Sequence, residues 1–235
     1  MAEHDTVLNM IRQRNEKPIT LHPQRTALLV IDMQRYFVRP HYPFGQIIEH
    51  LAPGATAGYF ERVNATVVPN INRLQDCFRS LGAPIFYTAA GSWMADGRDL
   101  PPWMKDYDEV GLAKLGQRIW PPVGDPSWEV DESIAPLPHE VVLNKPSSGT
   151  FTSTPIGQTL HTLNIEAVVV TGVTTDVCVG LGAREAADRG YQTIVASDAC
   201  TTLSAEMHQA NLDAFCLAFG RIRSTAEIVQ LMSSA

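Results

Sequence analysis

The chain has 235 residues, of which 45% are hydrophobic and 18% charged, and its formal net charge is −7 at pH 7. This length and composition suit one large α/β domain with a sizeable core and exclude an intrinsically disordered chain. The acidic balance, without a run of Lys or Arg, argues against nucleic acid or an anionic membrane as partner. No apolar run is long enough to cross a bilayer.

The cysteines indicate thiols rather than disulfides. Cys77, Cys178, Cys200 and Cys216 lie far apart, and no C-x-x-C pair occurs. The amino-terminal stretch 1–5 is polar and acidic, unlike the start of a secretory signal peptide. We therefore expect a cytoplasmic protein with reduced cysteines.

The first elements are expected before residue 90. Residues 1–24 are expected to form a polar arm that packs on the surface or on a partner subunit. The continuous apolar run over 26–32 predicts a buried strand that Asp32 closes. Apolar residues at helical spacing predict a helix over 60–81, and the run that follows predicts a strand over 84–88.

The second half of the chain alternates strands and helices. Further strands are expected at 140–145, 167–171, 192–196 and 221–223. Helices are expected at 154–163, 178–189, 204–219 and from 224 onward, where a capping box begins the last one. This alternation predicts a parallel sheet covered by helices on both faces, in a single domain over 25–235.

Residues 89–140 interrupt the alternation. The segment is rich in proline and has weak periodicity, and it holds every tryptophan of the chain: Trp93, Trp103, Trp120 and Trp128. Long irregular loops inside a domain are usually functional, so we expect a lid over the site. The alternative is that these aromatic side chains only pack the loop onto the domain or onto another subunit.

Three reactive groups follow predicted strands. Asp32 and Lys145 each close a strand, and Cys178 opens the helix after the fourth strand. Ligands of parallel sheets bind beyond the carboxyl ends of the strands, where these groups meet. A thiol at a helix N-terminus is favoured as thiolate, and the free N–H groups there can bind an oxyanion. The pattern predicts a cysteine nucleophile for acyl transfer.

Three motifs resemble those of the isochorismatase-like cysteine hydrolases. They are Asp32-Met-Gln34, Lys145-Pro-Ser-Ser-Gly-Thr-Phe151 with Thr154, and Gly172-Val-Thr-Thr-Asp-Val-Cys178. The resemblance covers about 25–220 and implies a three-layer α/β/α sandwich with a six-stranded parallel sheet. It implies a small amide or ureide substrate, such as nicotinamide, N-carbamoylsarcosine, ureidoacrylate or biuret. The motif order and the long loop look closest to the ureidoacrylate and biuret amidohydrolases.

The resemblance also implies roles for single residues. Asp32, Lys145 and Cys178 would form the catalytic triad, and the N–H groups of Thr174 and Cys178 the oxyanion hole. The Val173–Thr174 peptide bond would be cis. Candidates for substrate binding are Gln34, Phe37 and Phe151, with core packing as the alternative for the two phenylalanines. Asp176 is expected to cap or pair within the turn. His208 is expected to face solvent, with contact to a neighbouring subunit as the alternative.

One departure from the family bears on metals. Nicotinamidases carry an Asp-x-His pair for a metal, and none follows Asp32 before Lys145. His41, His50 and His139 are scattered, so we expect neither metal nor other cofactor and disfavour a nicotinamidase-like enzyme.

Two further alternatives stay open. A vinyl-ether hydrolase acting on isochorismate belongs to a branch that replaces the cysteine, so Cys178 argues against it. The other is a non-catalytic binding protein with the same fold. The resemblance also implies a homo-oligomer, either a dimer or a tetramer.

Overall fold

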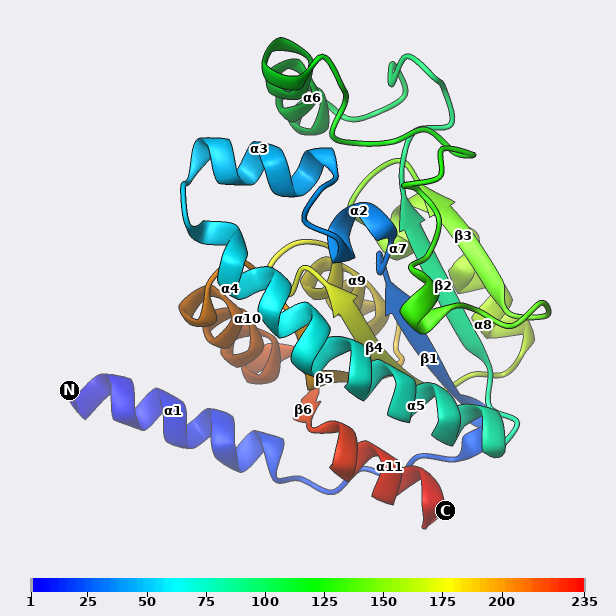
Figure 1. Ribbon diagram of the computed structural model, residues 1–235. Coiled ribbons are helices and arrows are strands. Elements are labelled where there is room, and N and C mark those ends of the chain that lie inside the picture. Colours follow the sequence, from blue (N-terminus) through cyan, green and yellow to red (C-terminus); the bar gives the residue numbers. More distant parts are fainter. Residues whose placement is uncertain (1, 235) are drawn as a thin grey trace.

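The computed structural model describes residues 2–234, with the side chains of residues 5–234. Its centre is a six-stranded sheet, all parallel, in the order β3-β2-β1-β4-β5-β6 (Figure 1). The strands are β1 (Thr26–Ile31), β2 (Ile85–Ala90), β3 (Val141–Lys145), β4 (Ala167–Val173), β5 (Gln192–Thr201) and β6 (Arg221–Arg223). The predicted three-layer fold is confirmed.

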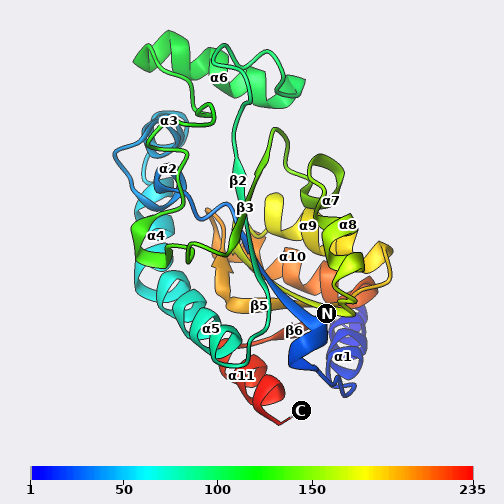
Figure 2. The same cartoon turned by 90° about the vertical axis from the view of Figure 1, so that its right-hand side faces the viewer.

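Helices cover both faces of the sheet, and Figure 2 shows them on either side of it. One face carries α4 (Ala55–Arg62), α5 (Val68–Ser80) and α11 (Thr225–Ser233). The other face carries α7 (Thr150–Ser153), α8 (Ile156–Thr162), α9 (Cys178–Asp188) and α10 (Ala205–Ala218). The strand order explains this double layer. The chain moves across the sheet in one direction from β1 to β3 and in the other from β3 to β6, so right-handed crossovers lie on opposite faces.

The central strand β1 explains why its sequence is apolar without alternation. Leu28 and Val30 point into the core beneath α5 and α11. Ala27, Leu29 and Ile31 point into the second core, beneath α8, α9 and α10. A strand covered on both faces needs apolar side chains at every position, as the sequence predicted.

The helix predicted over 60–81 begins earlier than expected. It is the end of a continuous helical stretch in which α4 leads through a π-helical turn, Val63–Val67, into α5. Pro69 lies in the first turn of α5, directly after the π-helical turn, where the i→i−4 bonding that a proline breaks is already interrupted. The start at α4 escaped prediction because Thr and Gly in that helix are weak helix formers.

The 89–140 segment is not irregular throughout. It contains α6 (Pro102–Leu115) and a short 3-10 turn, Glu132–Ile134. Pro102 stands at the start of α6, and Gly116 ends it with φ of 67°. Beyond the carboxyl ends of the strands, α6 lies near α2 (Arg35–Val38) and α3 (Pro43–Leu51), two helices that the sequence did not predict (Figure 1).

The expected amino-terminal arm is helical. Residues Ala2–Asn15 form α1, which packs against α10, and the Arg14 guanidinium donates to the carbonyls of Leu217 and Ala218. The helix lies at the end of the molecule opposite α6 (Figure 1). Among the described residues, no helix has both the length and the apolar character needed to span a membrane.

Candidate active site

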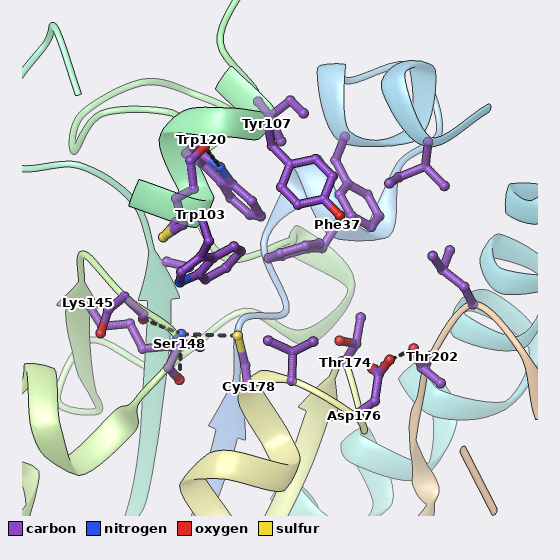
Figure 3. A pocket seen from close by; sticks show the side chains of 18 of the residues that line it. Phe37, Trp103, Tyr107, Trp120, Lys145, Ser148, Thr174, Asp176, Cys178 and Thr202 are labelled. Carbon is purple, nitrogen blue, oxygen red and sulfur yellow. Dashed lines mark hydrogen bonds between the residues drawn. The ribbon is translucent and has the colours of Figure 1, made fainter. Parts of the chain in front are cut away.

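Asp32, Lys145 and Cys178 meet beyond the carboxyl ends of the strands. Figure 3 shows Lys145 and Cys178 side by side at the cavity. Asp32 follows β1 and has φ of 53°, a left-handed conformation that Asp tolerates better than most residues. Lys145 ends β3 and reaches past the neighbouring strand end. Its Nζ lies 2.8 Å from Asp32 Oδ2 and 3.3 Å from Cys178 Sγ. The parallel topology thus brings together three residues far apart in the sequence.

The ammonium group of Lys145 is completely buried and surrounded by acceptors. Besides Asp32 and Cys178, the carbonyl oxygens of Ser147 and Ser148 lie 3.0 and 3.3 Å from its Nζ. Burial lowers the pKa of Lys145, but the charge of Asp32 and the hydrogen bonds to Asp32 and Cys178 outweigh this effect, and the net pKa is raised. Lys145 is therefore a fixed positive charge at the floor of the site.

The carboxylate of Asp32 is also fully buried. Its Oδ1 accepts a hydrogen bond of 2.8 Å from the Thr88 hydroxyl, which orients the group. Its Oδ2 lies beside Lys145 without a well-aligned hydrogen bond, and the carboxylate also contacts the Cys178 thiol. Lone pairs are therefore left on Asp32 to accept a proton from that thiol.

The protonation of Cys178 differs from the expectation drawn from the helix N-terminus. Burial raises the pKa of the Cys178 thiol, and Asp32 raises it further, while Lys145 lowers it. The net pKa is raised, so the resting group is a thiol rather than a thiolate. The expectation was wrong because burial and a neighbouring carboxylate outweigh the helix end. Loss of the thiol proton must therefore accompany attack.

The turn before Cys178 leaves backbone donors free. The Val173–Thr174 peptide bond is cis. The carbonyl of Thr174 accepts from the N–H groups of Val177 and Val179, which bracket Cys178. Within the described part of the chain, the N–H groups of Thr174 and Cys178 donate to no acceptor, and both residues line the cavity. Their arrangement suits an oxyanion.

A cavity of about 260 Å³ opens above these groups. Aromatic side chains form much of its wall, including Phe37 from α2 and Trp103 and Tyr107 from α6 (Figure 3). Trp120, from the chain that follows α6, stands edge-on to Trp103 at 5.7 Å between ring centroids. The 89–140 segment thus supplies cavity wall to its own chain.

Of the three candidates for substrate binding, the structure brings only Phe37 to the cavity. The Gln34 amide donates to the carbonyls of Ala90 and Trp128 and accepts from the Ala90 N–H, so it fastens the end of β2. Phe151 packs into the core around α8 and α9, with Tyr191 at 5.9 Å between ring centroids. Phe151 is therefore a core residue, as the alternative stated, and does not line the cavity.

Several wall residues had no individual signal in the sequence. They are Phe44 and Ile48 of α3, Met104 of α6, Ile119, Leu203 and Met207. The cluster of tryptophans pointed to a segment that contributes a large part of the wall, without indicating which side chains face inward. The periodicity of α3 was hidden because its residues follow a Pro-rich stretch.

Two arginines hold the 89–140 segment in place. The Arg39 guanidinium donates two hydrogen bonds of 2.7 Å to the buried Asp131 carboxylate. Arg35 pairs with Glu129 at 2.8 Å and with Glu132 at 3.2 Å. Arg35 therefore contacts the segment and does not line the cavity.

Two polar residues near Cys178 have defined partners. Asp176 lines the cavity, and its Oδ1 accepts a hydrogen bond of 2.7 Å from the Thr202 hydroxyl. His208 Nδ1 lies 2.8 Å from the Thr175 hydroxyl, and burial lowers the pKa of His208. The expectation that His208 simply faces solvent was wrong, because its ring packs against the turn that carries Cys178.

The histidines discussed for a metal lie on the surface. His41, His50 and His139 are all exposed. The described residues contain no group of three or more His, Cys, Asp or Glu side chains placed to hold a metal ion. All four cysteines are free thiols.

Comparison with known proteins places the chain in a family. Residues 26–227 match the isochorismatase domain. The chain is 27% identical to the N-carbamoylsarcosine amidase of an Arthrobacter species over 213 residues, 89% of this chain and 72% of that relative. It is 27% identical to the ureidoacrylate amidohydrolase RutB of Methylobacterium radiotolerans over 218 residues, 89% of this chain and 80% of the relative.

A solved structure has the same fold. A cysteine hydrolase from Pseudomonas syringae pv. phaseolicola superposes with a TM-score of 0.76 at 24% identity, covering 93% of this chain and 99% of the other. The match to the domain covers most of the chain, and the parallel sheet agrees with it. The chain belongs to the isochorismatase domain family of hydrolases.

Proposed function

We propose that the protein is a cysteine-dependent amidohydrolase that cleaves the C–N bond of a small amide or ureide. The observation that carries this proposal is the contact of one buried ammonium, that of Lys145, with both the Asp32 carboxylate and the Cys178 thiol. The names of two relatives, an amidase and an amidohydrolase, support the same reaction class.

The first half of the reaction forms a thioester. Asp32 takes the thiol proton of Cys178, and the sulfur attacks the carbonyl carbon of the substrate. The N–H groups of Thr174 and Cys178 bind the resulting oxyanion, and Lys145 balances the added negative charge. Asp32 then gives the proton to the departing nitrogen, and ammonia or an amine leaves.

The second half regenerates the enzyme. Asp32 accepts a proton from a water molecule, whose oxygen attacks the thioester carbonyl. The same N–H groups stabilise the second oxyanion. Collapse of this intermediate breaks the C–S bond, and the thiol of Cys178 recovers its proton from Asp32. A carboxylic or carbamic acid is released.

The alternatives predict different behaviour. A vinyl-ether hydrolase needs an acid and no thiol, so alkylation by iodoacetamide would leave its activity intact. A nicotinamidase-like enzyme with a resident metal would lose activity on dialysis against EDTA and regain it with zinc. A binding protein without catalysis would release no ammonia from any substrate.

The direct test is a panel of amides, ureides and carbamoyl amino acids assayed for ammonia release before and after alkylation. We expect ammonia from at least one class of compound, loss of turnover after alkylation of Cys178, and no effect of EDTA. Turnover that survives complete alkylation of Cys178 would contradict the proposal.

We further propose a homo-oligomer in the cytoplasm. Trp93, Trp103 and Tyr107 of the 89–140 segment are 61%, 38% and 40% exposed, and apolar surface of this kind often marks an interface. The free cysteines suit a reducing compartment. Sedimentation equilibrium at micromolar concentration is expected to give a dimer or tetramer. A stable, active species of 25.8 kDa would contradict an oligomer.

A further inference from the structure

The charged groups of the cavity are few. Among the side chains of the described residues that line it, Lys145 is the only cation, and Asp176 is the carboxylate on the wall. Arg62 reaches this wall from behind but does not line the cavity. Its guanidinium donates to the Thr201 hydroxyl and to the carbonyls of Thr202 and Leu203, so its charge is already engaged.

Lys145 has no hydrogen left for a substrate carboxylate. An ammonium group carries three N–H donors. Four acceptors already lie within 3.3 Å of Nζ: Asp32 Oδ2, Cys178 Sγ and the carbonyls of Ser147 and Ser148. A substrate anion would have to displace one of these four acceptors, either a reacting group or a backbone carbonyl that has no other partner among the described residues for its lost hydrogen bond.

The Asp176 carboxylate would repel a negatively charged substrate. Its Oδ1 is held by the Thr202 hydroxyl, within the cavity wall two residues before Cys178. A carboxylate on the substrate would therefore enter a largely apolar cavity with a like charge on its wall and no free cation. Burying an uncompensated charge in this way is costly.

The remaining wall suits an apolar group with π surfaces. Phe37 and Phe44 stand edge-on at 4.8 Å between ring centroids, and Phe37 and Trp120 lie at 6.2 Å. Trp103 and Tyr107 extend this aromatic wall from α6 (Figure 3). A cavity of ~150 Å³ is enough for benzene. The 260 Å³ available here hold one aromatic ring and a carboxamide.

From these observations we infer that the substrate is an uncharged primary amide with an apolar, preferably aromatic, body, and that carboxylate-bearing amides are rejected. The inference rests on the proposed function. It separates this chain from the substrates in the names of its relatives, since N-carbamoylsarcosine and ureidoacrylate both carry a carboxylate. Specificity then arises from the wall of the cavity, and in particular from α6.

The test uses two amides of nearly equal shape that differ in charge. These are 2-(4-nitrophenyl)acetamide and 4-(carbamoylmethyl)benzoate, because a nitro group is an uncharged isostere of a carboxylate. We expect kcat/KM for ammonia release to be at least about 100-fold higher for the nitro compound, the scale of an unpaired buried charge. N-carbamoylsarcosine and its methyl ester form a second pair, with the ester expected to be the better substrate.

A binding measurement separates this inference from the proposed reaction. The Cys178→Ala protein is titrated with both phenylacetamides, and binding is followed by calorimetry. Selective binding of the nitro compound, with no ammonia released from any amide of the panel by the intact protein, would overturn the proposed function and leave the rejection of anions by the cavity standing. Equal or preferred hydrolysis of the carboxylate would overturn the inference and leave the function standing. Failure of both compounds to bind would also overturn the inference.

A substitution at Asp176 tests whether its charge contributes to the rejection of anions. Asp176→Asn keeps an acceptor for Thr202 but removes the negative charge, so the preference for the nitro compound should fall by roughly 10-fold. Asp188→Asn, at the far end of α9 on the surface, is the matched control and should leave the preference unchanged. An unchanged preference in Asp176→Asn would overturn the role of this carboxylate in rejecting anions.

Discussion

The floor and the wall of the cavity are built in different ways. The floor consists of Asp32, Lys145 and Cys178, which are buried and held by the ends of β1 and β3 and the start of α9. Much of the wall comes from α2, α3 and α6, and its members Trp103 and Tyr107 are 38% and 40% exposed. The sheet therefore fixes the reacting groups, while helices outside the alternating pattern shape the space for the substrate.

This comparison predicts a severe effect at the floor. Cys178→Ala should lower kcat by at least about 10⁴-fold, since it removes the nucleophile. Its fold should be unchanged by circular dichroism and by the urea midpoint, because the thiol fills little volume. Cys77→Ala, on α5 away from the cavity, is the control and should keep full activity. Ordinary turnover in a folded Cys178→Ala protein would rule out the floor as the reacting site.

The partners of Cys178 should have the next largest effect. Asp32→Asn should lower kcat by about 10²–10⁴-fold, the range for loss of an acid/base group. Lys145→Ala should in addition destabilise the fold by about 3–5 kcal/mol, because it leaves the Asp32 carboxylate buried without its cation. Asp32→Asn combined with Cys178→Ala should cost little more than Cys178→Ala alone. Multiplicative losses in kcat would mean that the residues do not act together.

The floor could be predicted from the sequence because its physical causes are local and topological. The strand β1, buried on both faces, is visible as an unbroken apolar run that Asp32 ends. Lys145 ends the shorter run of the edge strand β3, whose first position is exposed. The turn before Cys178 is visible as well, because the apolar run of the preceding strand stops there. The protonation of Cys178 could not be predicted, because it depends on burial and on Asp32, which lies 146 residues away in the numbering (178 − 32).

The wall was only partly predictable. The tryptophans singled out the 89–140 segment, but α6 within it has a weak pattern, with Asp108 buried among apolar neighbours. Asp108 is buried because it accepts from the N–H groups of Ile119 and Trp120 and pairs with Arg118. A polar residue that organises a loop from the inside looks like a surface residue in the sequence.

Substitutions in the wall should change affinity more than chemistry. Trp103→Ala should raise KM for an aromatic amide by about 10-fold with a smaller change in kcat, because it removes one face of the cavity. Trp93→Ala is the matched control, since Trp93 belongs to the same segment, is 61% exposed and does not line the cavity. If both variants behave alike, α6 does not shape the site. A large loss in kcat with unchanged KM would mean that Trp103 contributes to the chemical step, which contradicts the distinction between floor and wall.

The smallest effect is expected where the wall is tied to the domain. Asp131→Asn weakens the pair with Arg39 and should lower the free energy of unfolding by about 1–3 kcal/mol at pH 7. Burial raises the pKa of Asp131, but hydrogen bonds from Arg39 and Ser133 outweigh it, and the net pKa is lowered. The carboxylate therefore stabilises the fold above its unfolded-state pKa of about 3.9, and this contribution is lost as the pH falls further.

Urea unfolding at pH 7 and near pH 3 checks this linkage. The difference in free energy of unfolding between wild type and Asp131→Asn should be smaller at the lower pH. Glu132→Gln, whose side chain is 65% exposed, should show no measurable change. A gap that stays constant with pH would mean that the charge of Asp131 does not stabilise the segment.

The most direct test of the floor as a reacting unit is to observe the covalent intermediate. An amide that the enzyme hydrolyses is mixed with it, quenched in acid within milliseconds and analysed by intact-protein and peptide mass spectrometry. We predict an adduct on the peptide containing Cys178 with the mass of the substrate less ammonia, formed at the rate of ammonia release and absent in Cys178→Ala. Turnover with no adduct, or an adduct on any other residue, would contradict the account.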